Sequence, residues 1–332
     1  MRWFALAVAA FLVGAGSLRT QPAGPERTFA EFFNAVLTVE NPDGGSWSPA
    51  GAYLEAAGQS EKPSQATMQR ILQKPIRQYR VLIVPGFMSA CSFTESATAG
   101  AFYQALEHLK TARGVDAQLL QVPDDSSENN GKLIAQYLRE HPGPKFIVVG
   151  HSKGAPDLQL ALQDRAAAER VAAFVSIAGA VGGSPLADLA EGRGFMRNVE
   201  ISGGCVGKLG AALDSIQTTV RHAFALSHPD PPVPSYSLVA ASTFANTSKI
   251  LLPTWGLLGA GFRGKEDGML IAADGILPGA KFLGTALADH VAVAHDFEQT
   301  RMAKLYDKDH FPRTALLEAL VRFIEADLES RR

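Results

Sequence analysis

The sequence has little cysteine, almost no net charge and no concentration of basic residues. Only two of its 332 residues are cysteine, Cys91 and Cys205, which excludes a disulfide-dense scaffold and a zinc site of four thiolates. The net charge is −2, from 31 Lys and Arg against 33 Asp and Glu. Because a protein that binds nucleic-acid phosphates needs a basic surface, nucleic acid is not an expected partner. With 46% hydrophobic and 19% charged residues, the composition is that of a folded globular protein.

An uncharged apolar stretch, Trp3 to Leu18, follows Arg2 and ends in the small residues Gly14 to Ser17. It is shorter than the roughly 20 residues that a membrane-spanning helix needs. The pattern is typical of a secretory signal peptide, which we assign to residues 1–17; a short membrane anchor or a buried helix is the alternative. We therefore expect a secreted or periplasmic protein.

Residues 18–78 form a lead-in to the main domain. An amphipathic pattern predicts a short helix over residues 28–37. Residues 41–63, which are rich in Gly, Pro and Ser, are expected to be irregular and to lie on the surface.

From Tyr79 onward, short apolar segments alternate with helical patterns. Strands are expected at 79–84, 116–122, 145–150 and 171–178. Helices are expected at 98–111, at 125–140 with Asp125 and Glu128 as a capping box, and after the strand at 145–150 to about residue 169. This alternation predicts a mostly parallel sheet with helices on both faces.

The middle of the chain departs from this alternation. Residues 185–232 are expected to form a helical cap insertion, in which an apolar stripe recurs at helical spacing through Leu209, Leu213, Ile216, Val220 and Phe224. Strands at 235–241 and 281–283, a helix ending near Leu258 and a last helix at 312–328 complete one α/β domain over residues 79–332.

Residues 150–154, Gly-His-Ser-Lys-Gly, fit the pattern G-x-S-x-G. They lie between an expected strand and an expected helix, which is the context that gives this motif its meaning. A sharp turn at this point strains the serine backbone and raises the hydroxyl above the sheet, and the flanking glycines avoid collisions. Ser152 is therefore a candidate nucleophile.

With these features, the region from Tyr79 to Phe297 resembles the α/β-hydrolase superfamily, in particular bacterial lipases and esterases. The resemblance implies that the serine attacks an ester carbonyl and forms an acyl-enzyme. It also implies a histidine as general base, an Asp or Glu that orients it, and the chain order serine, acid, histidine.

The implied order excludes the three histidines that precede Ser152. Of the other five, two lie in the insertion and one lies in a charged stretch before the last helix: His222, His228 and His310. His290 follows the last expected strand, where the family places its base, so we assign this role to His290. His295 is the alternative.

For the acid, residues 264–270 resemble the Asp-Gly turn of the family, 23 residues before His290. We assign the role to Asp267, with Glu266 and Asp274 as substitutes. An Asp-Gly pair is also common in ordinary turns.

Two backbone N–H groups are expected to form an oxyanion hole. The resemblance implies one from Lys153, after the nucleophile, and one from Phe87, after the first strand, with Met88 as the alternative to Phe87. The chain has Pro85 where the lipase pattern usually has His, but main-chain donors tolerate this change. We expect the Lys153 side chain to point away from the serine hydroxyl.

Residues 178–188 resemble a second lipase segment, in which Gly-Ser precedes a short helix ending in Ala-Asp. Some bacterial lipases bind calcium through an Asp two residues after the catalytic histidine. That position is Ala292 here, so no metal or other cofactor is expected.

Together these features predict an exported serine carboxylester hydrolase that acts on small-molecule or lipid esters, with contact to a lipid interface. An acyltransferase or thioesterase with the same triad, and a non-catalytic binding protein with this fold, are the alternatives. Export would also allow Cys91 and Cys205 to form a disulfide, whereas two separate buried thiols are the other outcome.

Overall fold

The computed structural model describes residues 24–56, 63–76, 78–87, 100–190, 209–261, 264–297, 303–308 and 310–332. The expected signal peptide, Cys91 and Cys205 lie outside these ranges, so signal peptide and disulfide stay predictions. Within the described ranges, each helix is too short or too polar to cross a membrane.

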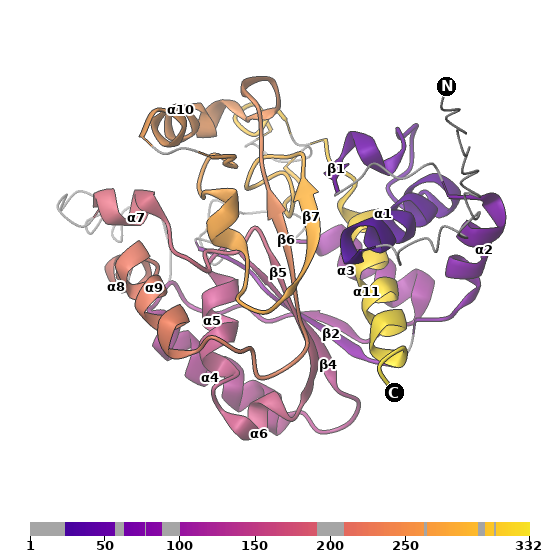
Figure 1. Cartoon of the computed structure of the whole chain (residues 1–332), viewed down its shortest axis with the longest axis horizontal. Coiled ribbons are helices and arrows are strands. Elements are labelled where there is room, and N and C mark those ends of the chain that lie inside the picture. The colour runs from indigo at the N-terminus through magenta and orange to yellow at the C-terminus, as the bar shows by residue number, and fades with distance from the viewer. Residues whose placement is uncertain are drawn as a thin grey trace, which may run out of the picture.

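A seven-stranded sheet forms the centre of the described part of the chain (Figure 1). Its strands are β1 (Leu54–Glu55), β2 (Arg80–Val84), β3 (Ala117–Leu119), β4 (Phe146–His151), β5 (Val171–Ile177), β6 (Ser235–Ala240) and β7 (Lys281–Ala286). The order across the sheet is β1-β7-β6-β5-β4-β2-β3, and only β1 runs antiparallel to its neighbour. The expected mostly parallel sheet is confirmed.

The strand register brings together the segments that follow the central strands. Val84 at the end of β2 is paired with Gly150 of β4, and His151 is paired with Ile177 at the end of β5. Because parallel strands end at the same edge of a sheet, the chain after β2 runs beside the turn after β4.

Helices cover both faces of the sheet. They are α1 (Pro25–Ala35), α2 (Gln65–Gln73), α3 (Tyr103–Arg113), α4 (Ser127–Glu140), α5 (Gly154–Ala161), α6 (Arg165–Ala168), α7 (Pro185–Ala190), α8 (Leu209–Asp214), α9 (Thr218–Ser227), α10 (Leu252–Gly261) and α11 (Arg313–Glu329). A π-helical turn spans Val36–Glu40, and 3₁₀ turns span Ala50–Ala52, Phe244–Asn246, Lys249–Leu251 and Ala272–Gly275. Helices α1, α3 and α11 lie on one face, and α4, α5 and α6 lie on the other.

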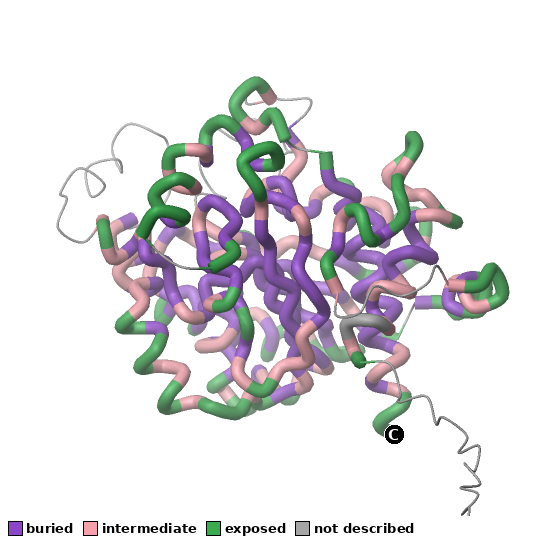
Figure 2. Tube along the Cα trace, turned by 45° about the horizontal axis from the view of Figure 1, so that its top comes forward, coloured by how far each residue is buried: buried purple, intermediate pink, exposed green. Residues whose placement is uncertain are grey.

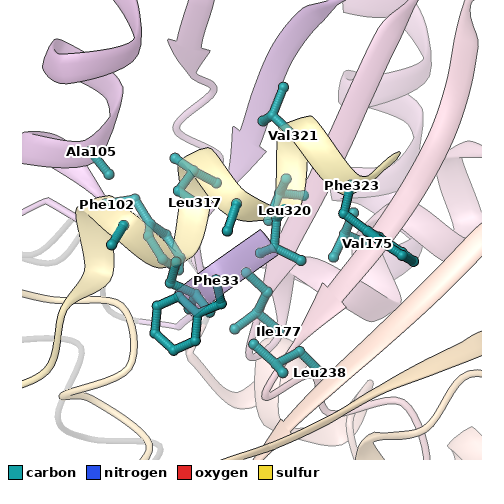
Figure 3. Close-up of a cluster of buried hydrophobic side chains, with 14 of the residues drawn as sticks. Phe33, Phe102, Ala105, Val175, Ile177, Leu238, Leu317, Leu320, Val321 and Phe323 are labelled. Carbon is teal, nitrogen blue, oxygen red and sulfur yellow. The ribbon is translucent and has the colours of Figure 1, made fainter. Parts of the chain in front are cut away.

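Successive residues of the central strands contribute to two separate hydrophobic clusters. In β2, Val81 and Ile83 pack with the first cluster, whereas Leu82 and Val84 pack with the second. This alternation follows from the two-residue period of a strand and explains why the central strands are buried on both faces (Figure 2). Figure 3 shows part of the first cluster, in which side chains from α11 lie against those from β5 and β6.

The described part of the lead-in belongs to this first cluster. Phe29 and Phe33 of α1 are fully buried, and the Phe29 ring meets the Phe323 ring of α11 edge-on at 5.8 Å. The expectation that residues 41–63 lie on the surface is wrong for Ala50 and Leu54, which are buried. The two-residue strand β1 is too short to show an alternating pattern in the sequence.

The start of α11 is capped from the lead-in. The carboxylate of Asp43 accepts hydrogen bonds from the backbone N–H groups of Thr314 (3.0 Å) and Ala315 (2.9 Å). These N–H groups have no acceptor within their own helix, so a carboxylate there stabilises the helix N-terminus.

The cap region differs from the expected single stripe. Helix α8 ends at Asp214 and α9 begins at Thr218, so the five apolar residues are divided between two helices and the turn that joins them. Ile216 in that turn is buried, but Val220 is 37% exposed. The most buried side chain of α9 is instead Arg221, which bonds to the Val181 carbonyl and the Gln159 side chain.

Two helix boundaries also differ from the prediction. The side chain of Ser126, and not that of Asp125, caps α4 by accepting the Asn129 N–H (3.2 Å). The helix expected to end near 169 is divided, because Asp164 caps a separate α6.

Candidate active site

Ser152 lies on a strained turn between β4 and α5. Its φ angle is +53°, in the left-handed region that non-glycine residues rarely adopt. The glycines around it leave no room for a side chain. An added Cβ would lie 2.5 Å from the Ser152 Cβ at Gly86, 2.6 Å from the Ala155 Cα at Gly150 and 2.1 Å from the Val84 carbonyl oxygen at Gly154. The turn therefore depends on close packing of the chain after β2 against the chain after β4.

Ser152, His290 and Asp267 form a continuous chain of hydrogen bonds. The Ser152 Oγ lies 2.8 Å from the His290 Nε2, and the His290 Nδ1 lies 2.8 Å from the Asp267 Oδ2. His290 and Asp267 are buried, whereas Ser152 is partly exposed. With an ionised Asp267, Nδ1 carries the imidazole hydrogen and Nε2 is free to accept the serine proton.

The turn that contains Asp267 fixes the orientation of its carboxylate. The backbone N–H groups of Met269 (2.9 Å) and Leu270 (2.8 Å) donate to its Oδ1, which leaves Oδ2 for His290. These bonds hold the carboxylate in one orientation.

The two substitute acids have other partners. The Glu266 side chain accepts the Gly268 N–H, and burial, with the nearby Asp267 charge, raises the pKa of Glu266 to about 7. Burial also raises the pKa of Asp274, whose backbone carbonyl accepts the Gly182 N–H (2.7 Å). Neither carboxylate is bonded to His290.

The loop after β7 carries His290 and is organised by the residue before it. The buried Asp289 accepts hydrogen bonds from the backbone N–H groups of Val291 (3.1 Å), Ala292 (2.8 Å) and Ser248 (2.8 Å). His295, the alternative base, has its ring 5.5 Å from the His151 ring, whereas the hydroxyl of Ser152 donates its hydrogen bond to His290.

The two expected oxyanion-hole residues, Lys153 and Phe87, belong to the two chain segments that meet at Ser152. Lys153 precedes the first residue of α5, where backbone N–H groups have no acceptor within the helix. Phe87 follows Gly86, which packs against Ser152, while Met88 lies outside the described residues. The Lys153 side chain points to Asp157, with its Nζ 2.7 and 2.9 Å from the two carboxylate oxygens.

The sequence motifs do not indicate the contacts of two buried polar residues, His151 and Asp289. His151 precedes Ser152, so the chain order of the family excludes it as the base. Its position at the end of the buried strand β4 is the signal that its side chain is buried. Asp289 was visible only as a neighbour of His290.

The segment 178–188 contacts the turn at Ser152, where the Ala180 N–H donates to the Ser152 carbonyl (3.0 Å). The Asp188 carboxylate accepts hydrogen bonds from the N–H (2.9 Å) and hydroxyl (2.7 Å) of Thr218, and so connects α7 with α9. Across the described ranges, no group of three or more His, Cys, Asp or Glu side chains is arranged to hold a metal ion.

A mostly parallel sheet with a serine on a strained turn after its central strand, and with a histidine and an aspartate on later loops, defines an α/β-hydrolase. The chain is 31% identical to the metagenomic carboxyl esterase MGS0156, whose crystal structure it matches with a TM-score of 0.76 over 92% of either chain. It therefore belongs to the lipase and esterase type of the α/β-hydrolase superfamily.

A second similarity supports the fold alone. The mature form of Bacillus licheniformis lipase BlEst2 is 24% identical, with a TM-score of 0.52 over 72% of this chain and 91% of the lipase. No family profile matches the chain, and no curated protein does.

Proposed function

We propose that this protein is an exported serine esterase that cleaves carboxylic esters through Ser152, His290 and Asp267. The observation that carries the proposal is the pair of 2.8 Å contacts that connects the serine hydroxyl to the imidazole and the imidazole to the carboxylate. The similarity to a carboxyl esterase supports the ester as the substrate class.

In this mechanism, Ser152 Oγ attacks the ester carbonyl while His290 Nε2 takes the hydroxyl proton. Asp267 stabilises the resulting imidazolium, and the N–H groups of Lys153 and Phe87 stabilise the oxyanion. His290 then gives the proton to the departing alkoxide, which leaves an acyl group on Ser152. Water hydrolyses this acyl-enzyme by the same steps, so the products are a carboxylic acid and an alcohol.

We further propose apolar or lipid esters as substrates, with contact to a lipid interface. Helix α10 has no charged residue, and its Leu257 is 49% exposed; next to it, Phe244 is 69% exposed. Figure 1 shows α10 at the end of the sheet toward which β6 and β7 point. The proposed nucleophile and base follow β4 and β7, so they lie at the same end. An exposed apolar surface there favours an apolar substrate.

Replacing Ser152 by Ala tests the enzymatic proposal. We expect ester hydrolysis to fall by several orders of magnitude, because the covalent route requires the hydroxyl. A fluorophosphonate probe should label the wild-type protein at Ser152 and leave the variant unlabelled. Unchanged hydrolysis by a folded Ser152→Ala variant would exclude the mechanism, and absence of labelling and of turnover in the wild type would favour the non-catalytic alternative.

The leaving group distinguishes the enzymatic alternatives. Ester, thioester and alcohol-acceptor reactions share the same acyl-enzyme, so turnover of matched ester and thioester substrates separates an esterase from a thioesterase.

Export rests on the N-terminal apolar stretch alone. N-terminal sequencing of protein recovered outside the cytoplasm tests it, and a chain that stays inside the cell with residue 1 intact contradicts it.

A further inference from the structure

A second line of hydrogen bonds runs behind the triad, through the backbone of His290. The N–H of His290 donates to the backbone carbonyl of Asp267 (2.8 Å), and the carbonyl of His290 lies 3.0 Å from the Nε2 of His151. His151 directly precedes Ser152. The backbone of the proposed base is thus tied at one end to the acid residue and at the other to the residue beside the nucleophile.

The partner of His151 defines which ring nitrogen carries its hydrogen. A carbonyl oxygen only accepts hydrogen bonds, so Nε2 is the donor. His151 is 2% exposed, and burial, together with the neighbouring His290 and His295, holds its pKa well below the ordinary value. The ring is therefore neutral, and its Nδ1 is a bare acceptor that has no partner among the described residues.

The ring of His151 is enclosed by other rings. Its centroid lies 5.0 Å from that of His290, 5.5 Å from that of His295 and 6.4 Å from that of Phe102, which meets it edge-on. A side chain buried in this way is shielded from a substrate bound at Ser152. Its contacts instead fix the position of the loop that carries His290.

We propose that His151 is a positioning residue that holds His290 at the correct distance from Ser152 by donating a hydrogen bond to the His290 carbonyl. The inference rests on the proposed function. In this second line, the hydrogen bond between Asp267 and His290 joins two backbone groups, so the side chain that takes part is that of His151. It is the link that a substitution can remove without altering the triad itself.

Three substitutions at His151 distinguish the effect of the hydrogen bond from the effect of the volume of the ring. In His151→Gln the amide nitrogen lies at about the position of Nε2, whereas in His151→Asn it lies at about the position of Nδ1. His151→Leu removes the donor altogether. Because small displacements of a catalytic group are costly, we expect the Asn and Leu variants to lose roughly 10- to 100-fold in kcat for p-nitrophenyl butyrate, with KM little changed. The Gln variant should stay within about fivefold of the wild type, because it retains the donor.

The rate of fluorophosphonate labelling at Ser152 should follow the same order as kcat, and thermal unfolding identifies any variant that does not fold. Folded Asn and Leu variants with wild-type kcat would overturn the proposal, and so would a Gln variant as impaired as the Asn variant. Nitrogen-15 NMR of the wild-type protein provides a test that needs no variant: His151 should show a protonated Nε2 and an unprotonated Nδ1 near neutral pH. The opposite tautomer would overturn the proposal as well. Ser152→Ala keeps the two hypotheses distinct, since its retained activity refutes the triad and not the His151 contact alone.

Discussion

The ion pair of Lys153 and Asp157 lies at the start of α5, directly after Ser152 in the chain, and its side chains are 3% and 1% exposed. Asp157 also accepts a hydrogen bond from the Asn130 side chain (2.8 Å). Burial raises the pKa of Asp157 in spite of the opposing Lys153 charge, which shows how strongly this environment disfavours an uncompensated ion. Removing either partner should therefore lower the free energy of unfolding.

Replacing Asp157 by Asn retains the shape of the side chain and leaves the Lys153 ammonium buried without a counter-charge. Breaking a buried pair in this way lowers the free energy of unfolding by about 3–5 kcal/mol. A Lys153→Met, Asp157→Leu double variant removes both charges, so it should recover most of that loss.

The single variant Lys153→Met should behave differently, because Asp157 can take up a proton. Removing the lysine charge raises the pKa of Asp157 in the folded state further above its unfolded value. The folded state then binds more protons than the unfolded state, so stability falls as pH rises from the unfolded pKa through the folded pKa. The deficit of Lys153→Met relative to wild type should therefore grow as the pH rises above the pKa of an unfolded aspartate, about 4.

Equilibrium unfolding in urea, followed by intrinsic fluorescence and by circular dichroism, measures these differences. A loss below about 1 kcal/mol for Asp157→Asn would refute the reasoning, because it would mean that the ammonium reaches water. A Lys153→Met deficit that is constant with pH would refute the assigned protonation of Asp157.

The remaining predictions concern the turn at Ser152 and the proposed acid, Asp267. Gly154→Ala should prevent correct folding, because the new methyl would lie 2.1 Å from the Val84 carbonyl oxygen; Gly256→Ala in α10, where an added Cβ has nothing within 4 Å, is the matched control and should still fold. The yield of soluble protein and its thermal unfolding measure both, and a well-folded Gly154→Ala would contradict the packing described. Asp267→Asn should lower kcat by roughly 10³- to 10⁴-fold, since an amide favours the wrong imidazole tautomer. Glu266→Gln should be much milder, and a larger effect at Glu266 would move the acid to that residue.

The central strands and the sequence of elements were predictable because each is a local pattern. β4 and β5 are short apolar runs, and a strand buried on both faces leaves this signature whatever it packs against. β1 and the cap of α11 were not predictable. Both depend on residues that meet only in the folded chain, such as Asp43 with Thr314.

The candidate site also has parts that local sequence patterns predict and parts that they do not. The prediction of Ser152 rests on its local context, and the choice of Asp267 and His290 rests on the chain order of the family and on their neighbouring residues. The contact of His151 with the His290 carbonyl joins residues 139 positions apart, and no local pattern reports such a contact. The same holds for the burial of Lys153, because its charge would suggest an exposed side chain.

The packing of α1 against α11 has a consequence for the order of events during synthesis. Phe29 is made early, but Phe323, which covers it, follows roughly 300 residues later, or about 15–60 s at usual rates of translation. Until α11 is complete, the first helix lacks its main packing partner. The edge strand β1 likewise has no strand to pair with until β7 has been made. The N-terminal part of the chain therefore cannot complete its native contacts until the last helix has been made.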